Sequence, residues 1–280
     1  MQTGPKSPDF GSTNLQARST GRQAGSTSPV WLIAWAVWIE AVRRKDLWVI
    51  AVLMAIYLVA AVALSIVRGA SPEETRFIFN LGLTVSFWLA AVLTALFAAR
   101  ELPAEMENLT LYPLLAKPVE RRDVILGKFA AVSSVGMATL AVFFLFVRAV
   151  SHWLPEFSAG LFLQCAVLQM LALALLAAIT LCATVWLPAA VSLIIGLVLF
   201  FAGGPLMGMA KSNVASSFGK AVEWLCYYLP DFDLFNLATR FTDGGPPLPA
   251  GEFFCLLLYS CVLTLVFLGA ASAGFERKAL

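Results

Sequence analysis

The chain has 280 residues, of which 60% are apolar and 13% are charged, and its net charge is +2. Soluble domains carry about 45–50% apolar and about 25% charged residues, so a soluble fold of this size could not bury so much apolar surface. Lipid is therefore expected to cover part of the chain. The small net charge, spread over short basic clusters, argues against nucleic acid as a partner.

The chain starts with a segment unlike the rest. Residues 1–29 are rich in Gly, Ser, Thr, Gln and Pro and lack an apolar run, which predicts a disordered cytoplasmic tail before a single membrane domain, residues 30–280. Residues 30–42 contain three tryptophans and are followed by the basic run Arg43-Arg44-Lys45. So short a stretch predicts an amphipathic helix lying along the cytoplasmic membrane surface rather than crossing it.

Six later stretches are long and apolar enough to cross a bilayer, which takes about 17–25 residues each. They are residues 47–67, 77–99, 129–147, 161–185, 189–209 and 253–274, and none contains Asp, Glu, Lys, Arg or His. The fourth and fifth meet at Trp186-Leu187-Pro188, which predicts a tight hairpin. Residues 214–229 carry an apolar stripe at helical spacing and predict a helix at the outer membrane surface. We therefore expect an all-α polytopic membrane protein with six transmembrane helices.

Basic residues near the span ends predict the orientation. With the N-terminus inside, the cytoplasmic flanks hold ten basic residues and the outer loops hold six. The ten are Arg43, Arg44, Lys45, Arg100, Lys117, Arg121, Arg122, Lys128, Arg277 and Lys278, and the six are Arg68, Arg76, Arg148, Lys211, Lys220 and Arg240. We expect the N- and C-termini to be cytoplasmic.

The spans offer little chemistry. The single histidine, His152, lies in a short outer loop, and the five cysteines form no C-x-x-C pair, so neither an intramembrane enzyme nor a metal site is expected. Ion-coupled carriers generally have buried charges, which these spans lack. The chain also lacks the G-x-x-x-x-G-K-[ST] phosphate loop, so we expect no bound cofactor and no ATPase activity of its own.

The cytoplasmic loop between the second and third spans, residues 100–128, is the most informative stretch. Pro103 predicts the start of a separate amphipathic helix, Pro113 and Pro118 interrupt the path, and Glu120 begins a helix leading into the third span. Its interleaved acidic and basic residues leave two interpretations open. One is a solvated connector anchored at the headgroups, and the other is a docking element for a soluble protein.

The stretch from Glu107 to Lys128 resembles the signature of permease subunits of ABC-2-type ABC transporters. That family has a Glu followed by Gly-Thr-Leu, a Leu-Leu pair, Pro-Val-Ser-Arg and Gly-Lys. The matching positions are Glu107, Thr110, Leu114, Leu115, Pro118, Val119, Arg121, Gly127 and Lys128. Leu109 stands in place of the family's Gly and Glu120 in place of its Ser. The stretches at residues 229–237 and 275–278 resemble the family's segment before the last span and its usual C-terminal ending.

The resemblance implies an ABC-2-type, type V exporter-like permease in the cytoplasmic (inner) membrane, with an N-terminal elbow helix. It implies a cytosolic ABC ATPase partner that holds ATP and Mg²⁺, a second permease subunit (homodimer or heterodimer), and surrounding membrane lipids. The ATPase-coupling residues it implies are Glu107, Thr110, Leu114, Lys117, Pro118, Arg121, Gly127 and Lys128.

The resemblance also implies transport of a substrate, with export as the expected direction. Within the family, the resemblance leans towards the branch that includes the permease for nitrous-oxide-reductase (multicopper enzyme) maturation. Two other classes stay open from the residues alone. They are a membrane scaffold or assembly factor that recruits a cytosolic protein, and an ATP-independent carrier.

Overall fold

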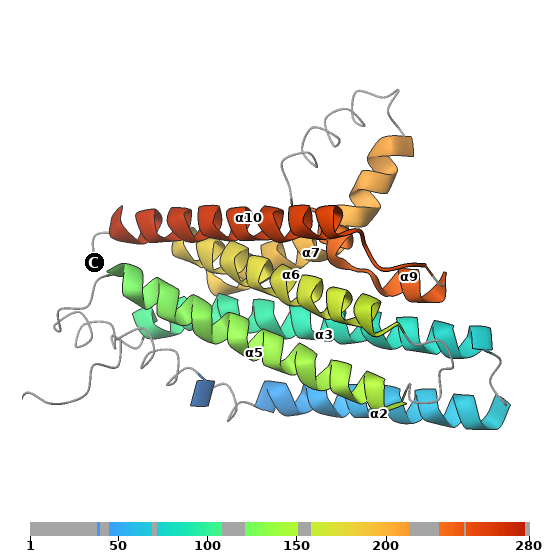
Figure 1. Cartoon of the computed structure of the whole chain (residues 1–280). Coiled ribbons are helices and arrows are strands. Elements are labelled where there is room, and N and C mark those ends of the chain that lie inside the picture. The colour runs from blue at the N-terminus through green and yellow to red at the C-terminus, as the bar shows by residue number, and fades with distance from the viewer. Residues whose placement is uncertain are drawn as a thin grey trace, which may run out of the picture.

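The computed structural model describes residues 38–39, 45–68, 72–107, 121–150, 158–212, 230–243 and 245–277. Within these ranges the secondary structure is helical, with no β-strand, so the all-α prediction is confirmed. Six long helices lie side by side (Figure 1). They are α2 (Lys45–Arg68), α3 (Pro72–Glu107), α5 (Arg121–Val150), α6 (Ala159–Trp186), α7 (Ala189–Ser212) and α10 (Ala250–Arg277).

Each long helix contains one of the predicted spans. Four stretches in the described part of the chain are long and apolar enough to cross a membrane: Arg76–Glu101, Arg122–Ala149, Ala159–Trp186 and Ala250–Glu276, while Ala189–Ala202 is apolar but shorter. The chain is thus a multi-pass membrane protein, and the count of six spans stays a prediction. The predicted tail, the predicted helix at 214–229 and most of the predicted surface helix lie outside the described residues.

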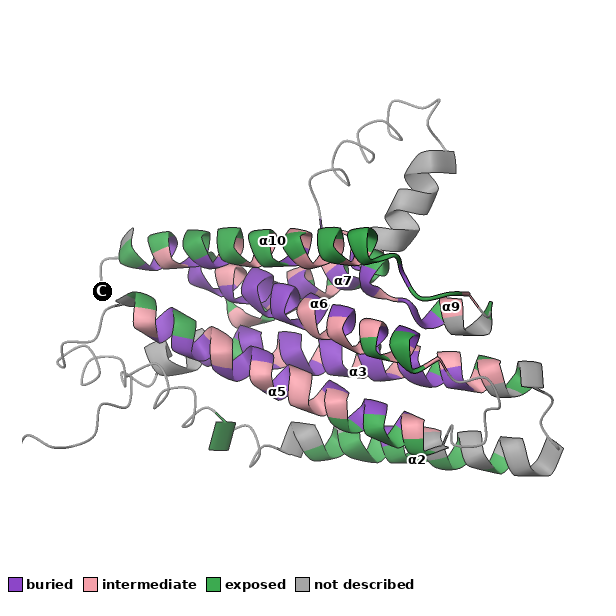
Figure 2. Ribbon diagram, in the orientation of Figure 1, coloured by how far each residue is buried: buried purple, intermediate pink, exposed green. Residues whose placement is uncertain are grey.

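Helix α6 lies at the centre of the bundle. It packs against α3, α5, α7 and α10, and its ribbon is almost continuously buried beyond its first turns (Figure 2). A helix that is apolar on all sides has no polar face to turn outwards, so the bundle interior is its natural place. Helix α2 is peripheral, packing mainly against α3 and α5, and exposes Trp48, Val52 and Ile56. These side chains form a surface suited to lipid.

The helices run between two ends of the bundle, and each end is named after the elements found there. At the α3–α5 end, α3 ends, α5 begins, α6 joins α7 and α10 ends (Figure 1). At the α9 end, α2 joins α3, α5 joins α6, and the short helices η2 (Asp233–Phe235) and α9 (Ala238–Thr242) pack against the bundle. This alternation is what the predicted topology requires, with the predicted cytoplasmic loops together at the α3–α5 end.

The predicted hairpin between the fourth and fifth spans is confirmed. Helix α6 ends at Trp186 and α7 begins at Ala189, leaving Leu187 and Pro188 as the whole turn. The Leu187 N–H donates to the Ala183 carbonyl at 2.9 Å, and the Ser192 N–H donates to the Pro188 carbonyl at 3.0 Å. These bonds satisfy backbone groups at the end of α6 and the start of α7.

Small residues let the helix backbones approach closely. A Cβ placed on Gly136 of α5 would collide with the Oγ1 of Thr94 in α3. A Cβ on Gly196 of α7 would lie 2.5 Å from the Oγ1 of Thr180 in α6. Such contacts are typical of membrane bundles, where close van der Waals packing rather than the hydrophobic effect joins the helices.

One local prediction is wrong. Pro103 does not open a separate helix, because α3 continues through it to Glu107. A proline inside a helix removes one backbone hydrogen bond, and here the lost donor would have paired with the Ala99 carbonyl. The helix tolerates this loss at a point just past Glu101, where its membrane-spanning stretch ends. Pro103 therefore lies inside α3 rather than at the start of a new helix.

Candidate functional site

The predicted coupling residues fall at the α3–α5 end of the bundle. Glu107 is the last residue of α3 and Arg121 is the first residue of α5, so the two bracket the loop between these helices. Gly127 and Lys128 lie in the second turn of α5, and both are buried. The remaining predicted positions, Thr110, Leu114, Lys117 and Pro118, lie outside the described residues.

Lys128 is the most unusual member of this set, because its side chain is 0% exposed. Its Nζ donates a hydrogen bond to the backbone carbonyl of Glu101 in α3 at 2.6 Å. Glu101 is itself only 5% exposed. Lysine side chains near helix ends usually extend towards water, so a fully buried amine needs partners inside the protein. At this site the amine joins the start of α5 to α3.

A second polar contact at the same end joins α5 to α10. The Nε of Arg122 donates to Oε1 of Glu276 at 2.8 Å, and their side chains are 65% and 43% exposed. Exposed ion pairs of this kind contribute about 0–1 kcal/mol to stability. The contact therefore adds little to the packing between α5 and α10 at this end.

At the α9 end, a segment between the last two long helices folds back into the bundle. Phe232 and Phe235 are 2% and 0% exposed, and the ring of Phe232 lies 5.3 Å from that of Phe200 in α7. Asn236 Oδ1 accepts from the Ala238 N–H at 3.2 Å and from Nε2 of Gln169 at 3.3 Å. The central helix α6 thus holds this segment by a side-chain amide pair.

Two carboxylates lie on the same segment. Oδ1 of Asp231 accepts from the Asp233 N–H at 3.0 Å. Partial burial, and then the charge of Asp231, raise the pKa of Asp233 above its ordinary value. The segment therefore carries an acidic group that responds to pH, and among the described residues its two carboxylates belong to no cluster arranged to hold a metal ion.

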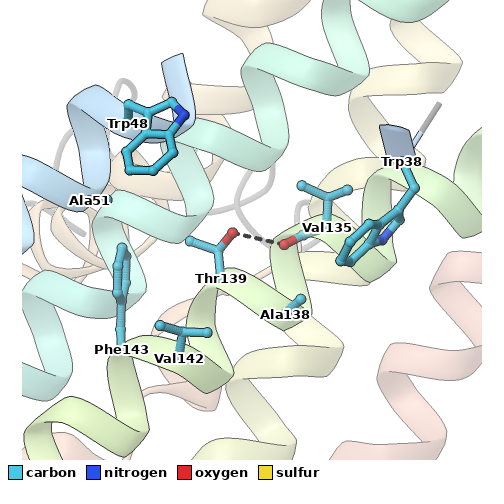
Figure 3. A pocket seen from close by; sticks show the side chains of 8 residues that line it. All are labelled: Trp38, Trp48, Ala51, Val135, Ala138, Thr139, Val142 and Phe143. Atoms are coloured by element: carbon cyan, nitrogen blue, oxygen red, sulfur yellow. Dashed lines mark hydrogen bonds between the residues drawn. The ribbon is translucent and has the colours of Figure 1, made fainter. Parts of the chain in front are cut away.

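An apolar groove of about 280 Å³ opens between α2 and α5 (Figure 3). Trp38 closes one side, with its Nε1 donating to Oγ of Ser134 at 3.1 Å. Thr139, the one polar side chain in the lining, donates its hydroxyl to the Val135 carbonyl at 2.9 Å and so offers little polarity to the groove. The lining consists of Trp38, Trp48, Ala51, Val135, Ala138, Thr139, Val142 and Phe143. The groove is suited to a hydrocarbon chain and to no polar chemistry.

Within the described ranges, no cluster of three or more His, Cys, Asp or Glu residues is arranged to hold a metal ion. The described cysteines are free thiols spread over separate positions of α6 and α10: Cys165, Cys182, Cys255 and Cys261. The polar groups of the spans instead bond to helix backbones, as when Thr180 Oγ1 donates to the Leu176 carbonyl at 2.8 Å. Bonds of this kind stay within one helix, and the described side chains form no array of the groups that acid–base or nucleophilic catalysis would need.

Sequence reasoning missed two features of the site. The burial of Lys128 is the first: the resemblance implies Lys128 as a coupling residue and the charge count places it on the cytoplasmic flank, but nothing in its neighbours along the chain marks it as buried. The return of residues 230–242 into the bundle was also missed, because Asp231, Asp233 and Asn236 give that stretch a polar composition. The repeated phenylalanines between them were the only available signal of burial.

Comparison with known proteins identifies the family. No curated protein matches the chain by sequence. The family model described as "ABC-2 family transporter protein" matches residues 31–280. That match includes all six long helices and both ends of the bundle, and its members are membrane components of transporters rather than enzymes. The chain belongs to the ABC-2 family, and it is a permease subunit of an ABC transporter, with the ATPase on a separate subunit.

Proposed function

We propose that this permease exports its substrate across the cytoplasmic membrane, using a cytosolic ABC ATPase that docks at the α3–α5 end. The docking surface comprises the end of α3, the loop at residues 108–120 and the first turn of α5. Glu107 and Arg121 are its most sensitive charges. In this arrangement ATP and Mg²⁺ bind to the ATPase subunit, and the permease contributes the path and the coupling surface.

The observation that carries the proposal is the length of α3. Its 36 residues span about 54 Å at 1.5 Å per residue, whereas the hydrocarbon core of a bilayer is about 30 Å thick. The membrane-spanning stretch ends at Glu101, so the last turn and a half, up to Glu107, continue beyond it as helix. A helix that continues beyond the membrane in this way places the start of the following loop on the soluble side, where a partner can reach it.

The charge pattern of the loop supports a protein partner over a membrane surface. A loop that only bound anionic headgroups would need basic residues, yet Glu105, Glu107 and Glu120 are interleaved with Lys117 and Arg121 along the chain. Mixed charge around apolar residues suits a groove on a folded protein, where opposite charges fix the register. The ATPase subunit is the partner that the family requires.

Two permease bundles supply the path in this proposal. The interior of one bundle is filled around α6, where Leu168, Ala172, Leu175 and Ile179 are at most 4% exposed. The hydroxyls of Thr139 and Thr180 bond within their own helices, and the amide Nε2 of Gln169 bonds to Asn236. We therefore place the substrate path between two permease subunits rather than through the middle of one, with a second copy of this chain as the simplest partner.

The test is recovery of an ATPase subunit with the tagged permease from detergent-solubilised membranes. The ATPase recovered with the wild-type chain is co-expressed with Arg121→Glu and with Glu107→Lys. Loss of one member of a desolvated charge pair typically costs about 2–5 kcal/mol, which lowers affinity by about 30-fold or more. We expect both variants to lose the ATPase while still inserting into the membrane.

Arg148→Gln is the matched control, because it removes a basic side chain of the same helix in its last turn, at the opposite end from the docking surface. This control should retain the ATPase at the wild-type level. Wild-type recovery by both Arg121→Glu and Glu107→Lys would show that the loop is a plain connector. Transport that persists in cells lacking every ABC ATPase would favour an ATP-independent carrier, and a partner without ATPase activity would favour a scaffold.

A further inference from the structure

The buried amine of Lys128 has no role in docking, because a side chain that is 0% exposed cannot touch a soluble partner. It nevertheless belongs to the same stretch as the docking residues. Its Nζ reaches across to α3 and donates to the Glu101 carbonyl at 2.6 Å. A basic group placed inside a membrane protein is costly and is usually kept for a function.

The acceptor shows that the bond serves the helix pair. A carbonyl at position 101 already lies within helix α3, which continues to Glu107, and a carbonyl oxygen has a second lone pair for another donor. The Lys128 amine donates to this second lone pair. The bond therefore links α5 to α3 in addition to the backbone hydrogen bonds within α3. A short bond from an ammonium group is stronger than a bond between neutral groups.

The position of the bond is equally informative. It lies where the membrane-spanning stretch of α3 ends, at Glu101, and only two turns from the start of α5 at Arg121. Around it the two helices bury Ala98, Val124 and Ile125, each at most 1% exposed. The helices are therefore joined by both packing and a polar bond, less than two turns from the two points from which the loop at 108–120 leaves.

We propose that Lys128 is a positioning residue that makes the end of α3 and the start of α5 one rigid unit. The inference rests on the proposed function in one respect, namely that the ATPase pulls or pushes on the loop between these helices. If the two helix ends could separate, part of that movement would be absorbed at the membrane boundary. With the amine in place, the pair moves together and carries the movement to α6, which packs against both.

The roles of Arg121 and Lys128 are then distinct. A change at Arg121 removes the ATPase, whereas a change at Lys128 leaves the ATPase bound and breaks the link between hydrolysis and the membrane helices. Lys128→Met tests this, because methionine fills much of the same space without an amine. We expect ATPase recovery within about twofold of wild type, but a loss of about tenfold in the effect of the permease on ATP hydrolysis, a typical size for coupling between sites.

A distance measurement tests the rigid unit directly. Spin labels at positions 104 in α3 and 126 in α5, in a chain whose native cysteines are replaced, report the separation of the two helix ends by pulsed electron paramagnetic resonance. In the otherwise unaltered chain we expect a narrow distribution that is the same in the nucleotide-free and vanadate-trapped complexes. Lys128→Met should broaden it, even in the permease alone, and Leu163→Ala on the outer surface of α6 should not.

The results separate this inference from the proposed function. A separation that changes by more than about one helical turn, or 5 Å, between nucleotide states in the labelled chain with Lys128 present would overturn the rigid unit without any variant at Lys128. Lys128→Met with an unchanged distribution and full coupling would also overturn it. Failure of the wild-type chain to recover an ATPase would count against the proposed function alone, since the distance in the isolated permease still reports on Lys128.

Discussion

The side chain of Gln164 holds the backbone of Leu248 by both of its polar groups. Its Nε2 donates to the Leu248 carbonyl at 3.1 Å, and its Oε1 accepts from the Leu248 N–H at 2.8 Å. Gln164 lies in the second turn of α6, and Leu248 lies two residues before α10, with a side chain that is 7% exposed. The pair therefore fixes the entry of the last long helix to the central helix of the bundle.

Gln164→Leu should destabilise the protein by about 1–3 kcal/mol, because it leaves both backbone groups of Leu248 without their partner in an apolar setting. For a chain of this size we expect a fall of about 2–4 °C in the thermal midpoint for each kcal/mol, measured in one detergent. Leu163→Ala is the control, since Leu163 is 65% exposed on the same helix. Equal midpoints for Gln164→Leu and wild type would show that the two bonds contribute nothing.

Gly136→Ala should lower stability by about 1–3 kcal/mol through overpacking against Thr94. The hydroxyl of Thr94 is fixed by its bond to the Ala90 carbonyl at 2.7 Å, so it cannot turn aside without losing that bond. The double variant with Thr94→Ala should recover most of the loss, which a double-mutant cycle of unfolding midpoints measures. Gly269→Ala is the control because its added Cβ meets nothing within 4 Å. Strictly additive effects at Gly136 and Thr94 would contradict the contact.

The raised pKa of Asp233 gives the fold a predictable pH dependence. The folded state disfavours the charged carboxylate, so the penalty is fully present above the folded-state pKa. The penalty falls as the pH is lowered through that pKa and is gone below the unfolded-state value. Asp233→Asn should therefore raise the thermal midpoint at neutral pH and flatten its rise towards acid pH. Asp243→Asn, an exposed change on the same segment, is the control, and a variant identical to wild type at pH 7 would refute the effect.

Accessibility to a membrane-impermeant thiol reagent tests the orientation. We expect a cysteine at Asp243, at the α9 end, to be labelled in intact cells, because the basic residues predict that this end faces outwards. A cysteine at Leu187, in the α6–α7 turn at the other end, should be labelled only after the cells are opened. Both are placed in a chain whose native cysteines are replaced. The reverse pattern would invert the topology and remove the docking proposal with it.

The long helices were predictable because their signal is local. A run of apolar residues without charges indicates a membrane helix by itself, so the predicted limits of α2 and α6 lie within two residues of the observed ones. The α6–α7 turn was predictable for the same reason, since Pro188 and the sheer length of the two apolar runs force a break between them. These features depend on neighbours along the chain.

The buried polar contacts were not predictable because their partners are distant in sequence. Lys128 bonds to Glu101, 27 residues earlier, and Gln169 bonds to Asn236, 67 residues later. At Pro103 the local signal for a helix start gave a wrong prediction, because α3 continues through this residue to Glu107. Which charged or amide side chains are buried depends on which helices pack together, and the composition of a single stretch does not indicate that packing.

The two-residue turn between α6 and α7 restricts the mechanical freedom of the whole bundle. Two extended residues reach at most about 7 Å, so neither helix can slip along the other by much more than one helical turn of 5.4 Å without straining Leu187 and Pro188. The hairpin is therefore a single body during any working cycle. Movement that the α3–α5 pair carries to α6 would therefore reach α7 as well.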